Sequence, residues 1–265
     1  MLVLVKKILM ITFLLVCIAV SLFAGWNLYR YYRVYHDGKK EYDTLEKYIE
    51  KNKSEDEGKV EKDAGAEEKD RCPIKVDFAS LRKINSDVVG WIHIPGTGID
   101  YPIVQAKDNR KYLHRTFQGK DSHVGAIFLD AVCKPDFSSF NSVIYGHNLK
   151  NGEMFGHLKK QYDVIYNPKA DYKKHRKIWI ITPEAAREYE IFAFREINIK
   201  KDRDVYTIEP ADPEEQKTFF EKQISRSQKK THFKSTGHLK MITLSTCTSQ
   251  TQDGRFVVQA VLQQH

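Results

Sequence analysis

The amino-acid sequence predicts a mainly β domain, either a closed barrel or a two-sheet sandwich, attached to an N-terminal membrane helix. About eight short segments are rich in aromatic and β-branched residues, with turn residues between them and no regularly alternating helices. One long helix falls between two late strand candidates, and one uncharged apolar run lies near the N-terminus. The strand candidates favour the β-rich domain, the single long helix is an addition to it, and the apolar run predicts the membrane helix.

Residues 8–26 (ILMITFLLVCIAVSLFAGW) form an uncharged apolar run with lysines before it and Arg30 after it. A helix of this length, at about 1.5 Å per residue, comes close to the roughly 30 Å thickness of a bilayer core. A cleaved signal peptide is the alternative, with Ala24 as a weak small-residue exit, but the run is too long for an ordinary signal-peptide core. We therefore expect a retained anchor. Basic residues flank both ends, so charge alone leaves its orientation open.

The segment after the anchor, residues 27–71, is expected to be a helical stalk followed by a charged linker. Residues 31–52 have a helix-forming composition that suits either a stalk or a helix packed on the domain. Residues 53–71 mix charges densely and offer almost nothing apolar to bury, so burial cannot offset the entropy of ordering them. The composition changes at about Cys72, and we expect the folded domain to span residues 72–265.

The formal net charge is +8, but no nucleic-acid recognition motif accompanies it. Many of the basic residues cluster within residues 159–177. This cluster predicts a solvated surface or a surface attracted to an anionic component of the cell envelope, such as phospholipid or a phosphorylated lipid carrier. A nucleic-acid partner is not expected.

Two helices and eight strands make up the expected domain. Residues 77–85 predict a short amphipathic helix with Asp77 as its N-cap. Residues 212–227 predict a longer helix, because Asp212 as N-cap and Glu215 three residues later form a capping box. The strand candidates are residues 88–94, 99–104, 125–130, 141–146, 177–182, 189–197, 239–246 and 255–263.

The cysteines exclude a complete disulfide framework, because Cys17 lies in the membrane segment and leaves three others, Cys72, Cys133 and Cys247. An isolated cysteine is most often a buried structural thiol. Cys247, however, follows the strand candidate at 239–246 and precedes the polar loop TSQTQDG. Rigid scaffolds often present catalytic groups at such positions. Cys247 is therefore a candidate nucleophile as well as a candidate core residue.

A cysteine nucleophile needs a proton partner and a group that stabilises an oxyanion. His147 stands out among the ten histidines, because the segment SVIYGHN presents it at the end of a strand. Arg255 opens the strand after Cys247, and a tight loop between the two strands would bring its guanidinium beside the sulfur. The alternatives are a packing or surface role for the histidine and a surface salt bridge for the arginine.

Several of these segments together resemble one enzyme family. TLSTC followed by an arginine at the start of the next strand, with YGHN about a hundred residues upstream, resembles the sortase signature. The segments VGWIHIPGTGIDYPIVQAKDNRKYL, GAIFLD and VIYGHNLKNGEMFGHLKK look like class B sortases and occur in the same order. The capped helix before the cysteine strand is similar to the insertion of that class. The resemblance covers roughly residues 75–265.

The resemblance implies a membrane-anchored cysteine transpeptidase of Gram-positive bacteria with a closed eight-stranded barrel outside the cytoplasm. It orients the anchor with residues 1–7 in the cytoplasm. It also implies that Cys247 is the nucleophile, His147 the general acid/base, Arg255 the oxyanion-stabilising or substrate-positioning residue, and Ser245 a substrate contact. No cofactor is implied. No metal is expected either, because nothing here resembles the acidic calcium cluster of some class A enzymes.

The implied reaction begins with cleavage of a C-terminal sorting motif, NPxTx-like, after its threonine. The threonine is then held as a thioester on Cys247 until an amino group of a peptidoglycan precursor of the lipid II type attacks it. The expected partners are surface proteins that carry a sorting signal, this precursor, and the plasma membrane that holds the anchor.

Two other hypotheses fit parts of the sequence. L,D-transpeptidases are also β-rich cysteine acyltransferases, but they typically carry an SHGC-like run that is absent here. An anchored binding or scaffolding module would explain the anchor, the linker and the basic cluster equally well. It would leave unexplained why Cys247, His147 and Arg255 all fall at predicted strand ends.

Overall fold

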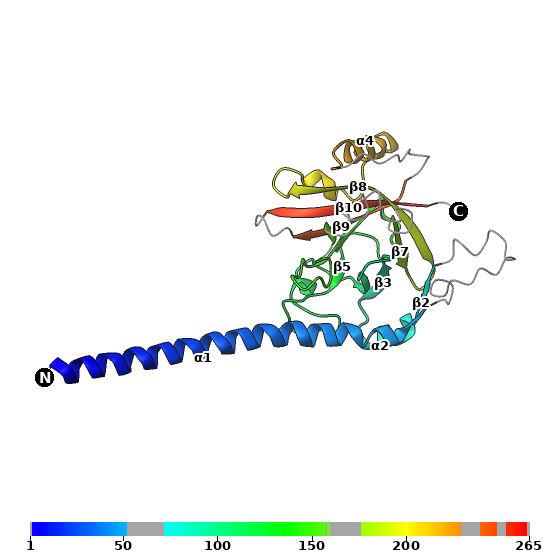
Figure 1. Ribbon diagram of the computed structural model, residues 1–265. Coiled ribbons are helices and arrows are strands. Elements are labelled where there is room, and N and C mark those ends of the chain that lie inside the picture. Colours follow the sequence, from blue (N-terminus) through cyan, green and yellow to red (C-terminus); the bar gives the residue numbers. More distant parts are fainter. Residues whose placement is uncertain are drawn as a thin grey trace, which may run out of the picture.

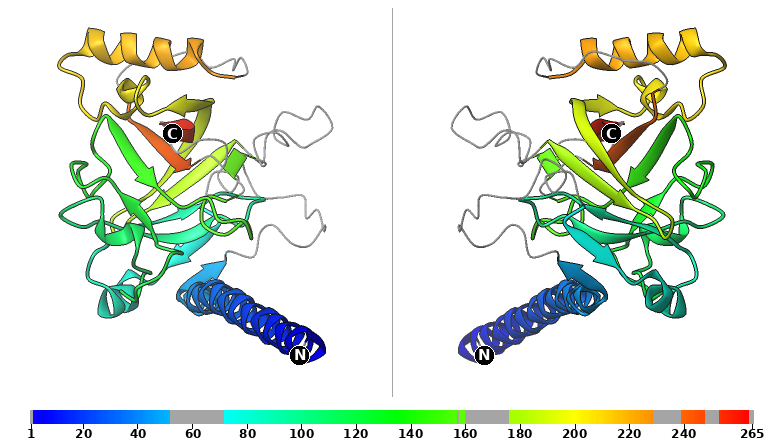
Figure 2. Two further views of the ribbon diagram at one scale, coloured as in Figure 1. Left: turned by 90° about the vertical axis from the view of Figure 1, so that its left-hand side faces the viewer. Right: turned by 90° about the vertical axis from the view of Figure 1, so that its right-hand side faces the viewer.

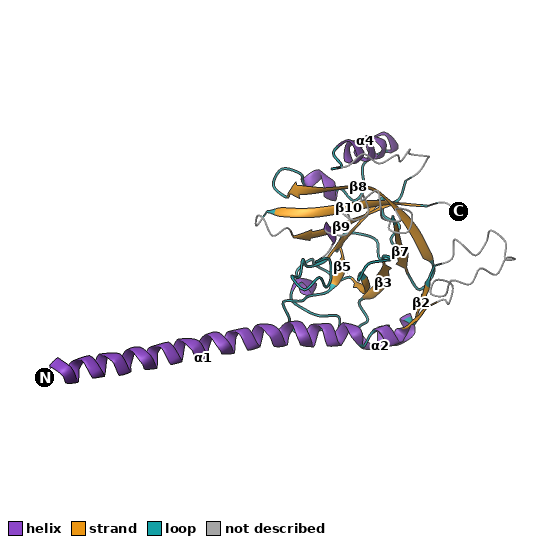
Figure 3. Cartoon of the chain, in the orientation of Figure 1, coloured by secondary structure: helices purple, strands orange, loops and turns teal. Residues whose placement is uncertain are grey.

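The computed structural model describes residues 2–51, 72–156, 158–159, 176–228, 239–247 and 253–263. Within these residues, eight strands close into a barrel in the order β10-β8-β7-β3-β4-β5-β6-β9 (Figures 1 and 3). The predicted eight-stranded barrel is therefore confirmed, and the sandwich is excluded. The strands are β3 Val88–His93, β4 Asp100–Val104, β5 Ile127–Leu129, β6 Asn141–Tyr145, β7 Lys177–Ile181, β8 Ala186–Asn198, β9 Met241–Cys247 and β10 Gly254–Leu262.

The barrel forms because these segments bury large apolar side chains on strands that leave no edge unpaired. Trp91 of β3, Leu244 of β9 and Phe256 of β10 are each at most 2% exposed and belong to one buried cluster. Six neighbouring pairs are antiparallel, while β4–β5 and β6–β9 are parallel. A parallel pair requires a long crossover, and residues 105–126 form the one between β4 and β5.

Helix α1 (Leu2–Asp43) runs without a break from the apolar segment to the barrel (Figure 1). It is the one helix of the described residues that is long and apolar enough to cross a membrane. Its C-terminal part differs from a free stalk, because Gly38, Glu41 and Tyr42 are buried and Tyr42 joins the buried cluster of the barrel. These buried positions are spaced three to four residues apart, so they form one face of the helix, and the domain covers this face.

Smaller elements complete the connection between α1 and the barrel. A 3₁₀ turn η1 (Glu46–Tyr48) leads into β1 (Ile49–Lys51), which pairs with β2 (Ile74–Val76). Helix α2 (Phe78–Ile84) follows, and the side chain of Asp77 caps it by accepting a hydrogen bond from Ser80 N at 3.0 Å. The predicted linker at 53–71 and most of the basic cluster at 159–177 lie outside the described residues.

Helix α4 (Pro213–Ser225) lies between β8 and β9 in the chain, on the side of the barrel opposite α1 (Figure 2). The predicted N-cap is confirmed, because Asp212 Oδ1 accepts from Glu215 N at 2.8 Å. Glu215 Oε2 in turn accepts from Ala211 N at 2.9 Å. Phe219 and Phe220 face the barrel in a separate buried cluster. Cys17 and Cys133 are free thiols.

Candidate active site

The strand register brings three predicted site residues to the same end of the barrel. Strands β6 and β9 are parallel, with Tyr145 paired to Ser245, so His147 and Cys247 each lie two residues beyond the same pair. Strands β9 and β10 are antiparallel, with Cys247 directly opposite Arg255. Neighbouring strands are about 4.8 Å apart. The backbones of His147, Cys247 and Arg255 therefore lie side by side at one end of the barrel, which we call the rim.

The crossover between β4 and β5 holds the imidazole of His147. Its Nε2 lies 2.8 Å from the carbonyl oxygen of Leu113. A carbonyl oxygen can only accept, so Nε2 carries the hydrogen and the neutral ring keeps its lone pair on Nδ1. Nδ1 is thus the ring nitrogen that can exchange a proton with a reacting group.

Gly125 packs against the same ring from the end of this crossover. A Cβ atom at this position would lie 2.7 Å from His147 Cδ2 and 3.0 Å from Nε2. The backbone also has φ +63°, in the left-handed region that favours glycine. Both the space and the backbone conformation require a glycine here.

The surroundings of His147 favour its neutral form. Burial lowers the pKa of the imidazole below its usual 6.5, because the charged form loses solvation. The hydrogen bond to Leu113 acts in the opposite direction, while His114 and His123 lower the pKa further. The imidazolium is therefore the minor form at neutral pH.

The other predicted residues are placed by β9 and β10. Cys247 is described by its backbone, as the last residue of β9. Arg255, partly buried, donates from Nη1 to Gly254 O at 2.8 Å. Ser245 is 2% exposed, and its hydroxyl lies 2.8 Å from the hydroxyl of Tyr206, which comes from the 3₁₀ turn η3 (Arg203–Tyr206). The pair formed by Ser245 and Tyr206 therefore lies beneath the rim.

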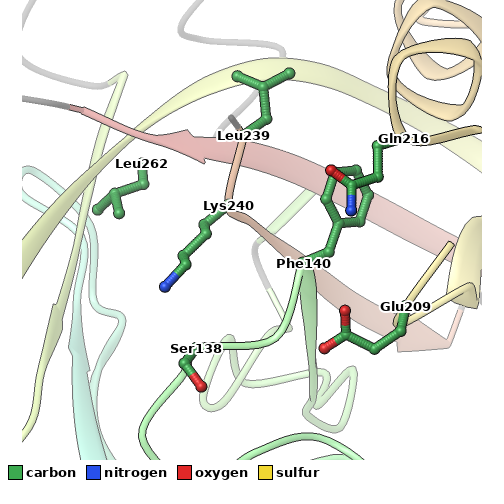
Figure 4. Close-up of a pocket in the computed structure, with 7 residues that line it drawn as sticks. All are labelled: Ser138, Phe140, Glu209, Gln216, Leu239, Lys240 and Leu262. Atoms are coloured by element: carbon green, nitrogen blue, oxygen red, sulfur yellow. The ribbon is translucent and has the colours of Figure 1, made fainter. Parts of the chain in front are cut away.

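A cavity of about 520 Å³ lies elsewhere, between α4 and the barrel (Figure 4). Lys240 precedes the first residue of β9 and Leu262 ends β10, so the cavity is at the strand ends opposite Cys247 and Arg255. At about 3.3 Å per residue, the length of β9 separates the two places by roughly 20 Å. The cavity is distinct from the rim. Its lining residues are Ser138, Phe140, Glu209, Gln216, Leu239, Lys240 and Leu262.

Among the described residues, no three His, Cys, Asp or Glu side chains converge in a way that would hold a metal ion. The rim itself offers a cysteine, an imidazole with a lone pair on Nδ1, and a guanidinium.

Comparison with known proteins assigns this architecture to a family. The family model for sortase domains matches residues 92–263. The chain belongs to the sortase family. Sortase B of Listeria monocytogenes serovar 1/2a (strain ATCC BAA-679 / EGD-e) is 31% identical over 194 residues, which cover 71% of this chain and 75% of that protein.

Solved structures of the same class share the fold. Sortase B from Bacillus anthracis in complex with AAEK1 superimposes with a TM-score of 0.67 and 29% identity, over 88% of this chain and 100% of that chain. A Staphylococcus aureus sortase B–substrate complex gives a TM-score of 0.62 and 27% identity, over 71% and 84%. The class B resemblance is thus confirmed and the protein is a cysteine transpeptidase, which excludes the L,D-transpeptidase and scaffolding hypotheses.

Three contributors to this sortase's rim were not found from the sequence. They are the carbonyl of Leu113, the backbone of Gly125 and the hydroxyl of Tyr206. A backbone carbonyl leaves no side-chain signature in a sequence. Gly125 begins the strand candidate GAIFLD, and a glycine directly before a strand was a usable signal of a special backbone conformation.

Proposed function

We propose that this sortase cleaves a C-terminal sorting motif, NPxTx-like, after its threonine and transfers the protein, through that threonine, to an amino group of a peptidoglycan precursor. Cys247 is the nucleophile, His147 the general acid/base and Arg255 the group that stabilises the oxyanion or positions the substrate. The observation that supports these roles most strongly is the register of three adjacent strands, β6, β9 and β10. A related S. aureus enzyme has been solved as a substrate complex.

In the first half-reaction, the thiolate of Cys247 attacks the threonine carbonyl, and a sulfur–carbon bond forms. The carbon–nitrogen bond then breaks, and Nδ1 of the His147 imidazolium gives its proton to the departing amine. The assignment to Nδ1 follows from the hydrogen bond between Nε2 and Leu113. Arg255 offers its guanidinium to the negative charge that develops on the carbonyl oxygen.

In the second half-reaction, the acceptor amine attacks the thioester while Nδ1 of His147 takes its proton, and Cys247 leaves as a thiolate. The thioester preserves the bond energy of the peptide, so no ATP is required. Because the pKa of His147 is lowered, imidazolium and thiolate coexist in a minority of molecules. A small competent fraction therefore carries turnover.

Substrate binding involves Ser245 in this proposal. Its hydroxyl and that of Tyr206 form one hydrogen-bonded pair on the β9 side of the rim. Either hydroxyl can also accept a hydrogen bond from a substrate amide while the other remains its partner. Ser245 therefore contributes to substrate contact directly or through Tyr206.

The proposed domain order places residues 1–7 in the cytoplasm, the anchor at 8–26, and residues 27–71 and the catalytic domain at 72–265 outside. The enzyme would be a single-pass membrane protein whose clients are exported surface proteins with a C-terminal sorting signal. The acceptor would be a lipid II-type precursor, which is presented at the outer face of the same membrane.

Intact-mass spectrometry tests this function directly. The enzyme is mixed with NPxTx, LPxTG and SPxTG peptides, and triglycine is added afterwards. We expect an acyl adduct with an NPxTx peptide that triglycine discharges, and none with Cys247→Ala. Substitution of His147 by Ala is expected to slow adduct formation by about 10²- to 10⁴-fold, the usual contribution of a general acid/base. An adduct that persists in Cys247→Ala would overturn the assignment of the nucleophile.

A further inference from the structure

The C-terminal end of α1 is hydrogen-bonded to the crossover that holds His147. The hydroxyl of Tyr42 donates to Gly125 O at 2.8 Å and accepts from Phe117 N at 3.2 Å. This hydroxyl therefore both donates and accepts a hydrogen bond within one loop. The neighbouring Glu41 accepts from Gln118 N through Oε1 at 2.9 Å.

Close packing fixes the position of the helix against this crossover. A Cβ atom on Gly38 would lie 2.8 Å from Cγ2 of Val124, so the helix approaches the loop as closely as a glycine permits. Lys120 forms an ion pair with the buried carboxylate of Glu41 at 3.2 Å. The hydrogen bonds of Tyr42 therefore join two surfaces that are already in contact.

Helix α1 also reaches the loop that follows His147. The rings of Tyr42 and Tyr101 pack edge to face with centroids 5.5 Å apart, and the hydroxyl of Tyr101 accepts from Met154 N at 3.2 Å. The next residue, Phe155, donates its N–H to His147 O at 3.0 Å. Tyr42 is thus bonded directly to the crossover and is linked through Tyr101 to the loop that is hydrogen-bonded to the backbone of His147.

Gly125 connects the hydrogen bond of Tyr42 to the imidazole ring of His147. Its carbonyl is held by Tyr42, while its Cα packs against the imidazole with no room for one more carbon atom. Ala126 N donates to Tyr112 O at 3.0 Å, which closes the loop beside Leu113 and its bond to Nε2. A shift of Gly125 by a few tenths of an ångström therefore either presses on the ring or releases it.

We propose that Tyr42 is a positioning residue: through Gly125 it fixes the orientation of the His147 imidazole, so that the helix extending from the membrane anchor sets the geometry of acid/base catalysis. The inference rests on the proposed role of His147. It assigns to α1 a contribution to the reaction in addition to attachment at the membrane.

The test uses the full chain in lipid nanodiscs and the substitution Tyr42→Phe, which removes one hydroxyl and keeps the ring. The matched control is Tyr31→Phe on the same helix, because Tyr31 is 51% exposed and its hydroxyl donates to that of Tyr35 at 2.9 Å, away from the crossover. We expect Tyr42→Phe to lower kcat about 10- to 100-fold, the effect of misplacing a catalytic group, with KM nearly unchanged. Tyr31→Phe should match the unsubstituted enzyme.

Two further measurements distinguish an effect on the orientation of His147 from an unspecific loss of activity. The pH at which the His147 imidazole titrates, followed by NMR, should shift in Tyr42→Phe and stay constant in Tyr31→Phe. In a His147→Ala background, Tyr42→Phe should cause no additional loss of the residual rate, because it acts through the missing ring. If Tyr42→Phe unfolds at the assay temperature, Glu41→Ala removes the adjacent bond to Gln118 and should show the same split between kcat and KM.

An unchanged kcat and an unchanged titration in folded Tyr42→Phe would overturn the proposal. So would an equal loss of rate with and without His147. Failure of the proposed function has a different signature, since His147→Ala alone would then retain the full acylation rate.

Discussion

At the scale of single residues, His147 differs from a surface histidine because its neighbours fix which ring nitrogen carries the hydrogen and lower the pKa of the ring. The Leu113 carbonyl fixes the hydrogen on Nε2, burial opposes the positive charge, and the two histidines nearby oppose it further. A ring so placed is neutral at rest and basic at Nδ1 only. The minor imidazolium form can donate from Nδ1 in the first half-reaction, and the neutral ring that remains can accept at the same atom in the second.

The titration of His147 should therefore lie below the usual histidine pKa of about 6.5. We expect NMR of labelled histidines, with His147→Gln for assignment, to give a midpoint below this value. His114→Gln should raise it, because His114 lowers the pKa of His147. The exposed His36 on α1 provides the control substitution His36→Gln, which should leave the midpoint unchanged. A wild-type midpoint above 6.5 would contradict the assigned environment.

The lowered pKa of His147 also makes the stability of the fold depend on pH. The folded protein binds fewer protons at His147 than the unfolded chain does between the lowered pKa and about 6.5. The free energy of unfolding should therefore decrease as the pH falls through this interval and level off below it.

At the scale of elements, the sequence determines caps and strands better than crossovers. The helix at 212–227 was predicted from Asp212 and Glu215; Asp212 caps it as expected, and Glu215 accepts from Ala211 N, one residue before the cap. Such signals are local. The crossover between β4 and β5 carries no such pattern, and its contact with His147 depends on β4 and β5 being parallel, which no short segment encodes.

Glycine substitutions in this crossover separate backbone strain from contact with the site. Gly119 (φ +80°) and Gly125 (φ +63°) both have left-handed backbones, but a Cβ on Gly119 would meet nothing within 4 Å. The left-handed backbone should cost alanine roughly 1–2 kcal/mol of stability at either position, and the close contacts at Gly125 should add to this cost. Only Gly125→Ala should also lower the acylation rate, by about 100-fold, because it displaces the imidazole. Chemical unfolding and intact-mass kinetics on both variants measure the two effects, and equal rates would contradict the contact.

At the scale of the whole molecule, one continuous helix, α1, joins the candidate membrane span to the domain. The sequence predicted a helical stalk and a charged linker over residues 27–71, and left a helix packed on the domain as the alternative for residues 31–52. The structure shows that Val34, Tyr35 and Tyr42 lie on the face that meets the domain. The sequence could not decide between the two, since the surface that covers the helix comes from residues 99–126 and has no local signal near the helix.

This arrangement predicts that the enzyme works at a fixed height above the bilayer. Only residues 27–33 separate the proposed anchor from the first docked residue, about 10 Å of helix. Seven helix-forming residues inserted after Arg30 preserve the docked face, because they complete nearly two turns, and raise the barrel by about 10 Å. We expect transfer to a lipid-linked precursor in proteoliposomes to fall several-fold, since misplacement of reacting groups is costly. Transfer to soluble triglycine should not change, because the barrel and its docked helix are intact. Equal rates with both acceptors before and after the insertion would show that the height of the barrel does not matter.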